Sequence, residues 1–190
     1  MAIRHGLLAL LDEGPAYGYQ LKAAFEERTG GTWLLNIGQV YTTLARAERD
    51  GLVAHLEVDD EGRVIYEITA AGREVVARWT SFYKQHRAIL DSDIIHGRRP
   101  DARDIDFYLH VNPRLEEKAL VMAFNPLDTP AEKDLVVPLY YAGVKDRVTV
   151  VDALGKSRDY TLDRDHRITL PVKMKPQDAT WFIVRNRGGK

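Results

Sequence analysis

The chain contains no cysteine among its 190 residues. This absence excludes disulfide bonds and thiolate metal sites, and it fits a cytoplasmic location. Long apolar runs are also missing: no stretch approaches the roughly 20 residues needed to cross a bilayer, and the amino terminus lacks the basic and then apolar signature of a signal peptide. We therefore expect a cytoplasmic protein without a membrane partner.

Positive charge is scarce in the first part of the chain. Up to residue 80 the sequence has eight Lys and Arg against twelve Asp and Glu, while the whole chain carries a formal net charge of only −1. An acidic balance disfavours strong nonspecific binding to nucleic acid, which depends on neutralising phosphates. Specific binding stays open, provided that the cations gather on one face.

The segment 37–49 carries the most informative pattern. Val40, Leu44 and Ala47 recur at spacings of four and three residues, which places them on one buried face of a helix. The other side is polar and short-chained, as suits contact with base edges and phosphates in a major groove; it carries Gln39, Thr42, Thr43, Arg46 and Arg49. DNA contact is the favoured interpretation, and an ordinary solvated helix face is the alternative.

The surroundings of this helix complete a recognisable unit. Gly51 suits the left-handed position that closes a helix, and the apolar runs 52–58 and 63–69 flank a turn-forming Asp59-Asp60-Glu61-Gly62, which predicts a hairpin. Two earlier helices are expected, one over residues 3–11 and one from Gly18 or Tyr19 to Arg28. The order of three helices and a hairpin predicts a winged helix-turn-helix.

Four separated motifs in this region occur in a characteristic order: Gly14-Pro15-Ala16-Tyr17-Gly18-Tyr19-Gln20-Leu21, Gly38-Gln39-Val40-Tyr41-Thr42-Thr43-Leu44, Glu48-Arg49-Asp50-Gly51-Leu52-Val53 and Tyr66-Glu67-Ile68-Thr69-Ala70-Ala71-Gly72. Together they resemble the PadR family of bacterial transcriptional regulators. The resemblance implies a repressor-like domain that acts as a homodimer on a palindromic operator in double-stranded DNA. That family usually has a larger apolar residue where this chain has Ala47, so looser packing of the recognition helix is expected.

The expected DNA contacts extend beyond the recognition helix. Tyr17 and Tyr19 could bind phosphates or pack at the edge of the core, and Arg63 could bind a phosphate or remain a solvated hairpin charge. The neighbouring acids 59–61 should repel DNA and weaken the contact of the wing. The full set of expected DNA-binding residues is Tyr19, Gln39, Tyr41, Thr42, Thr43, Arg46, Arg49 and Arg63.

The second half of the chain has a β pattern. Turn signals separate seven short apolar or alternating runs, a spacing that suggests an antiparallel β-sandwich; the runs are 107–111, 119–124, 133–138, 147–151, 157–162, 167–170 and 179–185. The fold class is therefore α+β with two domains: a winged helix over 1–78, a linking helix and connection over 79–100, and a sandwich over 101–190.

A second resemblance covers roughly residues 79–187. The segments Leu90–Asp101, Leu109–Pro113, Phe124–Pro126 and Pro138–Tyr141 are similar to the carboxy-terminal end of a family of large glycoside hydrolases, in which a β-sandwich follows a catalytic barrel. Catalytic carboxylates of such enzymes sit at the ends of barrel strands, and those strands are absent here. We expect no catalytic residue, no cofactor and no enzyme activity.

A long helix should join the two halves. Val76, Trp79, Tyr83 and Leu90 form an apolar stripe that must be buried, either on the sandwich or on a second copy of the chain. We assign the stripe to dimerisation. The join itself could reflect a natural gene fusion, an engineered chimera or an artefactual gene product.

The histidines and carboxylates after this helix show no paired spacing of metal ligands, so no metal site is expected. A salt-bridged connection between helix and sandwich is expected instead; it would involve Asp93, His96, Arg98, Arg99 and Asp101. Two functions fit the sequence. The favoured one is a transcriptional regulator whose sandwich senses a small-molecule effector or is purely structural, and the alternative is a non-catalytic accessory sandwich whose winged helix serves protein contacts.

Overall fold

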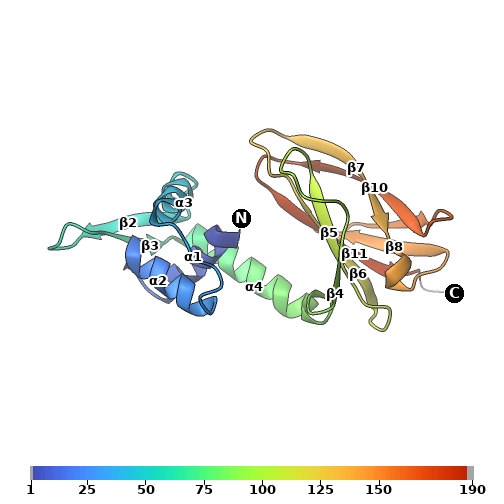
Figure 1. Ribbon diagram of the computed structural model, residues 1–190, viewed down its shortest axis with the longest axis horizontal. Coiled ribbons are helices and arrows are strands. Elements are labelled where there is room, and N and C mark those ends of the chain that lie inside the picture. Colours follow the sequence, from blue (N-terminus) through green and yellow to red (C-terminus); the bar gives the residue numbers. More distant parts are fainter. Residues whose placement is uncertain (1, 188–190) are drawn as a thin grey trace. The chain divides into compact units, whose positions relative to one another are not determined.

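The computed structural model describes residues 2–187, which divide into two units, Met1–Gln85 and His86–Lys190 (Figure 1). We call them the winged-helix unit and the sandwich unit. Helices and antiparallel strands are segregated along the chain, with helices mainly in the first unit and strands mainly in the second. The predicted α+β class is confirmed.

The winged-helix unit follows the predicted order of elements. Its helices are α1 (Ala2–Glu13), α2 (Gly18–Arg28) and α3 (Ile37–Arg49), and its strands are β1 (Ala16–Tyr17), β2 (Val53–Val58) and β3 (Val64–Ile68). The strands pair antiparallel in the order β1-β3-β2. The short β1, which pairs with Tyr66 and Ile65, is the only element of this unit that the sequence pattern did not suggest among the described residues.

A single apolar core holds the unit together. Residues from every helix and from the hairpin contribute, and burying each large side chain stabilises the fold by about 1.5–3 kcal/mol; the core includes Leu7, Leu8, Leu11, Leu21, Phe25, Val40, Leu44, Ala47, Leu52 and Ile68. Ala47 is 2 % exposed, so the small side chain does face the core. Val75 and Val76 of the following helix pack against the same cluster.

Helix α4 (Ala70–Leu90) crosses the boundary between the two units. His86 lies inside it with non-helical dihedral angles, φ −109° and ψ 15°, which mark a kink. The division between the units falls at the same place, after Gln85. The last turn of α4 therefore belongs to the sandwich unit.

The sandwich unit contains two antiparallel sheets. The six-stranded sheet has the order β4-β5-β6-β11-β8-β9, and the two-stranded sheet pairs β10 with β7. The strands are β4 (Asp93–His96), β5 (Asp106–Val111), β6 (Glu117–Phe124), β7 (Ala131–Pro138), β8 (Arg147–Asp152), β9 (Ser157–Thr161), β10 (Arg167–Met174) and β11 (Ala179–Asn186), with a 3₁₀ turn at Tyr140–Ala142.

The two sheets bury one face each against a common core. In β10 every second residue from Ile168 to Met174 is buried, which is the alternation expected of a strand with one solvated face. Residues of β7 such as Leu135 and Val137 meet Leu109 and Val121 of the larger sheet in the same cluster. This arrangement confirms the predicted antiparallel sandwich.

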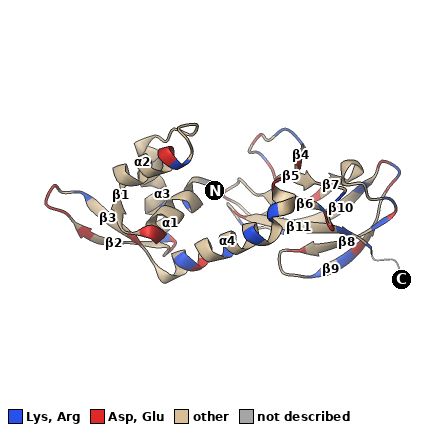
Figure 2. Cartoon of the chain, turned by 90° about the horizontal axis from the view of Figure 1, so that it is seen from below, with Lys and Arg blue, Asp and Glu red and all other residues tan. Residues whose placement is uncertain are grey.

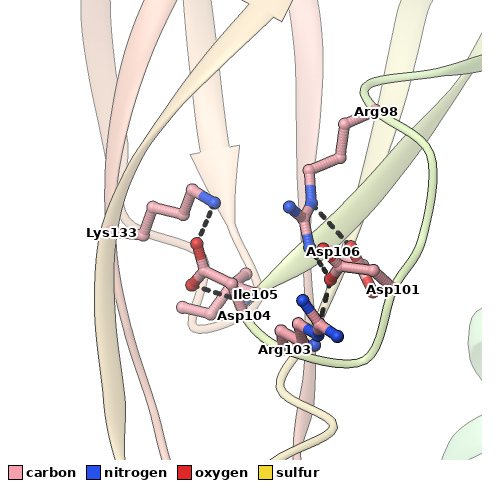
Figure 3. Close-up of polar contacts among 7 residues, drawn as sticks. All are labelled: Arg98, Asp101, Arg103, Asp104, Ile105, Asp106 and Lys133. Atoms are coloured by element: carbon pink, nitrogen blue, oxygen red, sulfur yellow. Dashed lines mark hydrogen bonds and ion pairs between the residues drawn. The ribbon is translucent and has the colours of Figure 1, made fainter.

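The connection before the sandwich contains a strand that the sequence pattern did not suggest. Asp93–His96 form an edge strand that pairs with Tyr108–Val111. Arg98 is the centre of the polar network that follows: its Nε donates to Asp106 at 2.7 Å and its Nη2 donates to Asp101 at 2.6 Å (Figure 3). Arg98 and Asp101 thus form a salt bridge, as predicted, and Asp106 is a further partner that the sequence did not indicate.

Neighbouring charges extend this network. Asp101 accepts a further hydrogen bond from the Arg103 amide at 3.0 Å, and this bond together with Arg98 lowers the pKa of the Asp101 carboxyl. Asp104 pairs with Lys133 of β7, which lowers the pKa of Asp104 (Figure 3). The loop is therefore tied both to β5 and to β7.

A β-bulge in the six-stranded sheet creates a second polar network. Ala119 pairs with Val184, but the next pair is Glu117 with Arg185, so Lys118 is the extra residue. At the bulge Glu117 meets two side chains: its carboxylate lies 2.8 Å from His86 Nδ1 and accepts from Arg185 Nη2 at 3.0 Å. His86 is 6 % exposed, so the sandwich holds the kinked residue of α4 in a buried polar network.

Candidate nucleic-acid interface

The start of α3 is fixed by reciprocal capping. Asn36 Oδ1 accepts a hydrogen bond from the Gly38 amide at 2.8 Å, and Gln39 Oε1 accepts from the Asn36 amide at 3.3 Å. These contacts satisfy amides that a helix start otherwise leaves without partners. Gln39 thus has a structural task as well as an exposed position on α3.

The turn before α3 is anchored by one carboxylate. Glu26 accepts from the Leu35 amide at 2.9 Å and pairs with Lys22 at 3.0 Å. The hydrogen bond from Lys22, followed by that from Leu35, lowers the pKa of Glu26. Because Leu35 directly precedes the cap of α3, this contact fixes where the helix begins.

The two sides of α3 differ as the sequence predicted. Val40, Leu44 and Ala47 are buried, whereas Gln39, Thr42, Arg46 and Arg49 are on the accessible side and Thr43 is half-buried. The hydroxyls of Thr42 and Thr43 donate to the Gly38 and Gln39 carbonyls, each at 2.7 Å. In this arrangement the two threonines present lone pairs, not donors, to an approaching ligand.

Tyr41 lies against the beginning of α2. A Cβ atom at Gly18 would come within 2.7 Å of the Tyr41 ring, so only glycine leaves room for this packing. Tyr41 is still 41 % exposed, and Tyr19 on the first turn of α2 is 59 % exposed. Both tyrosines can reach a ligand, and Tyr41 also fixes α3 against α2.

The two arginines on α3 differ in whether they form an ion pair. Arg49 donates to Asp50 through Nε at 3.2 Å and Nη2 at 3.1 Å, and Asp50 also pairs with Arg4. Among the described residues, no carboxylate pairs with Arg46. Arg46 is therefore the cation on this face that is available for an external hydrogen-bond acceptor.

The wing arginine is held by its own hairpin. Arg63 Nε donates to Asp59 at 2.7 Å, its Nη1 lies 2.7 Å from Glu61, and its guanidinium stacks 4.4 Å from the centroid of the Tyr17 ring. The amide and guanidinium of Arg63 lower the pKa of Asp59. A phosphate would have to compete with these contacts, which favours a structural role for Arg63 over the predicted phosphate contact.

Ion pairs between basic and acidic side chains occur throughout the winged-helix unit. Figure 2 shows acidic residues clustered at the wing and interspersed with basic ones elsewhere. In the described part of the chain, at least six of the eight Lys and Arg residues up to position 80 form an ion pair with a carboxylate; these include Arg4, Lys22, Arg28, Arg49, Arg63 and Arg73. Most of the positive charge is thus compensated within the unit.

The residues assigned to dimerisation are not gathered on one open face. Val76 packs against the winged-helix core, and Trp79 makes ring contacts with His5 at 5.4 Å and Phe82 at 5.6 Å. Tyr83 is 45 % exposed, whereas Leu90 lies beyond the kink in the sandwich unit. Tyr83 is accordingly the member of this stripe that is best placed to meet a partner.

Sequence reasoning missed three residues that position α3, namely Asn36, Glu26 and Gly18. Asn36 and Gln39 have the spacing of a capping box, so this signal was present in the sequence. Glu26 and Gly18 gave no comparable signal because their contacts, with Leu35 and Tyr41, depend on how α2 and α3 pack.

Within the described residues, no group of three or more His, Asp or Glu residues is arranged to hold a metal ion. None of the described helices combines the length and the apolar character that crossing a membrane demands.

Comparison with solved structures gives matches to both halves of the chain. A PadR family transcription regulator from Clostridium difficile R20291 is 21 % identical over 48 % of this chain and 96 % of its own length, with a TM-score of 0.43. PadR of Bacillus subtilis, solved with operator DNA, is 22 % identical over 42 % of this chain and 47 % of its own, with a TM-score of 0.38.

A Bacillus halodurans protein provisionally named an α-N-acetylgalactosaminidase is 14 % identical over 50 % of this chain and 21 % of its own length, with a TM-score of 0.37. A comparison with the curated proteins finds no match.

A family model matches part of the chain: residues 7–78 match the transcriptional regulator PadR-like family. The second half of α1, the helices α2 and α3, the wing and the first turns of α4 lie in that range, and residues 7–78 therefore form a PadR-like domain.

Proposed function

We propose that the chain is a DNA-binding transcriptional regulator of the repressor type, which acts in the cytoplasm and reads its operator with α3. The observation that carries this proposal is the accessible face of α3, where Gln39 and Thr42 accompany Arg46, a cation without a carboxylate partner among the described residues. Such side chains suit base edges in a major groove. The match of residues 7–78 to a regulator family supports the same function.

Selection from a randomised duplex library tests this function directly. Wild-type protein should enrich a defined sequence, and the Arg46→Ala variant should bind that sequence about 5- to 100-fold more weakly, as expected for the loss of one good base contact. Arg73→Ala is the matched control, because Arg73 is an exposed arginine of α4 whose neighbour is Asp12. Failure to enrich any sequence, or equal losses in both variants, would contradict the proposal.

We further propose that two copies bind a palindromic operator through contacts along α4. A palindrome requires two linked recognition helices about 34 Å apart. Tyr83→Glu should convert a dimer into a monomer in light scattering and weaken operator binding. This variant is cleaner than a change at Trp79, because Trp79 contacts His5 within the winged-helix unit. A monomeric wild type would contradict the proposed dimer.

A further inference from the structure

We propose, on the basis of the function proposed above, that Arg46 reads a guanine in each half-site and that the Nε2 donors of Gln39 lie on the same face of α3. The proposal concerns the chemistry of the base that is recognised. It follows from the contacts that α3 already makes within the protein, because those contacts determine which donors and acceptors remain for DNA.

Arg46 supplies the first donors. Its guanidinium is accessible and, within the described part of the chain, has no carboxylate partner, whereas Arg49 on the same helix is bound to Asp50. A guanidinium presents several N–H groups in a planar fork and has no acceptor. It is thus suited to a base edge that shows two acceptors side by side.

Gln39 supplies donors for a different reason. A free glutamine amide recognises adenine by donating from Nε2 and accepting through Oε1 at the same time. Here Oε1 already accepts from the Asn36 amide as part of the capping box, which occupies one of its two lone pairs and leaves both Nε2 hydrogens available to a ligand. Bidentate recognition of adenine would require the same Oε1 to accept a second hydrogen bond while it keeps the helix cap.

The major-groove edges of the bases select among the alternatives. Guanine shows two acceptors, N7 and O6, whereas adenine shows one acceptor and one donor and cytosine shows a donor. The Arg46 guanidinium, which only donates, matches the two acceptors of guanine and leaves the donor groups of adenine and cytosine without partners. Thr42 can still accept a hydrogen bond, because its hydroxyl proton is directed to the Gly38 carbonyl.

The competing role for Arg46 is a phosphate contact. A phosphate contact would strengthen binding to all sequences alike, whereas a guanine contact depends on atoms of one base. Replacing guanine N7 by a carbon removes one acceptor from the major groove. Replacing guanine by inosine removes only the minor-groove amino group and keeps N7 and O6. The two analogues therefore separate the two roles.

The experiment uses the duplex enriched by wild-type protein and measures its dissociation constant with 7-deazaguanine or inosine at each guanine in turn. At one symmetry-related position, 7-deazaguanine should weaken binding about 5- to 100-fold and inosine should leave it unchanged. In the Arg46→Ala variant the effect of 7-deazaguanine at that position should disappear. Arg73→Ala, the control, should retain the full effect.

The possible results are distinct. A selected duplex on which 7-deazaguanine has no effect, or on which its effect persists in Arg46→Ala, would overturn the guanine contact while leaving DNA binding intact. Selection of a half-site without guanine would do the same. Enrichment of no duplex at all would overturn both this proposal and the function on which it rests.

Discussion

The winged-helix unit and the sandwich unit place their polar side chains in different environments. Among the described residues, the buried polar side chains are His86, His110 and Asn125, and all three belong to the sandwich unit. The polar contacts of the winged-helix unit instead lie at its surface, in helix caps and ion pairs such as Arg63 with Asp59. Exposed pairs contribute little to stability, whereas a buried polar group that loses its partner is costly.

Because of this difference, we expect single substitutions of polar residues to lower the stability of the two units unequally. We also expect acid to destabilise the sandwich unit before the winged-helix unit. Urea titrations followed by ¹⁹F NMR of 5-fluorotryptophan can separate the units, because Trp33 and Trp79 lie in the winged-helix unit and Trp181 lies in the sandwich.

The largest effect is expected at Asn125. Its Nδ2 donates to the Thr129 and Lys175 carbonyls at 2.9 and 2.8 Å, and its Oδ1 accepts from the Leu127 amide at 3.1 Å. Asn125→Ala removes all three bonds and should lower the free energy of unfolding of the sandwich by about 3 kcal/mol or more. The Trp181 signal should show this loss while the Trp33 signal keeps its midpoint.

Asn186→Ala is the matched control for this substitution, because Asn186 is exposed at the end of β11. It should change the free energy of unfolding by no more than a surface substitution usually does, about 0.5 kcal/mol. Similar losses in the two variants would mean that burial of Asn125 does not decide the outcome.

The next largest effect is expected at Glu117. Glu117→Ala leaves His86 and Arg185 without their carboxylate and should destabilise the sandwich by about 1.5–3 kcal/mol. Glu132→Ala, which removes an exposed carboxylate paired with Lys173, serves as the control and should cost less than about 1 kcal/mol. Hydrogen exchange of the amides in the last turn of α4 should rise in Glu117→Ala only; unchanged exchange would rule out a role for Glu117 in holding that turn.

Acid should weaken the sandwich through His110. Burial lowers the pKa of His110 below its usual 6.5, so the unfolded chain binds a proton that the folded chain resists. Stability should therefore be complete above about pH 6.5 and fall towards pH 5, with a slope of at most about 1.4 kcal/mol per pH unit. The Trp181 midpoint should show this slope, and His110→Gln should remove it. A slope of equal size in the variant would assign it to other groups.

The smallest effect is expected at the wing. Arg63→Ala removes exposed ion pairs with Asp59 and Glu61 and the stacking on Tyr17, and should lower the stability of the winged-helix unit only slightly. Because these contacts already occupy the guanidinium, Arg63→Ala should weaken operator binding much less than Arg46→Ala. Equal losses of affinity would identify Arg63 as a phosphate contact after all.

The sequence predicts the elements whose residues repeat at a fixed spacing. Val40, Leu44 and Ala47 identify α3 because a helix returns to the same face after three or four residues, and the alternation in β10 identifies a strand with one buried face. The exposed side of α3 follows directly from the same spacing. The sequence alone therefore indicates which polar residues of α3 could contact DNA.

Features that depend on pairing between distant segments were not predictable in the same way. Asp93–His96 is too short to show a pattern, and it becomes a strand because β5 offers an edge. The contact of Glu117 with His86 results from a one-residue bulge opposite Arg185, which leaves no trace in composition or periodicity. The contacts that compensate the charge of Arg63 likewise depend on how the hairpin folds and packs against Tyr17.

The kink at His86 affects how the chain could be dissected. A fragment of the sandwich that began at β4 would lose His86 and Ile89, which are 6 % and 1 % exposed, so a transplant of this unit should start before His86. A winged-helix fragment that ends at Gln85 keeps Val75 and Val76. Boundaries between domains are usually sought in exposed, flexible linkers. In this chain the cut that keeps His86 and Ile89 with the sandwich unit falls inside a helix, where a truncation series guided by loops alone would never place it.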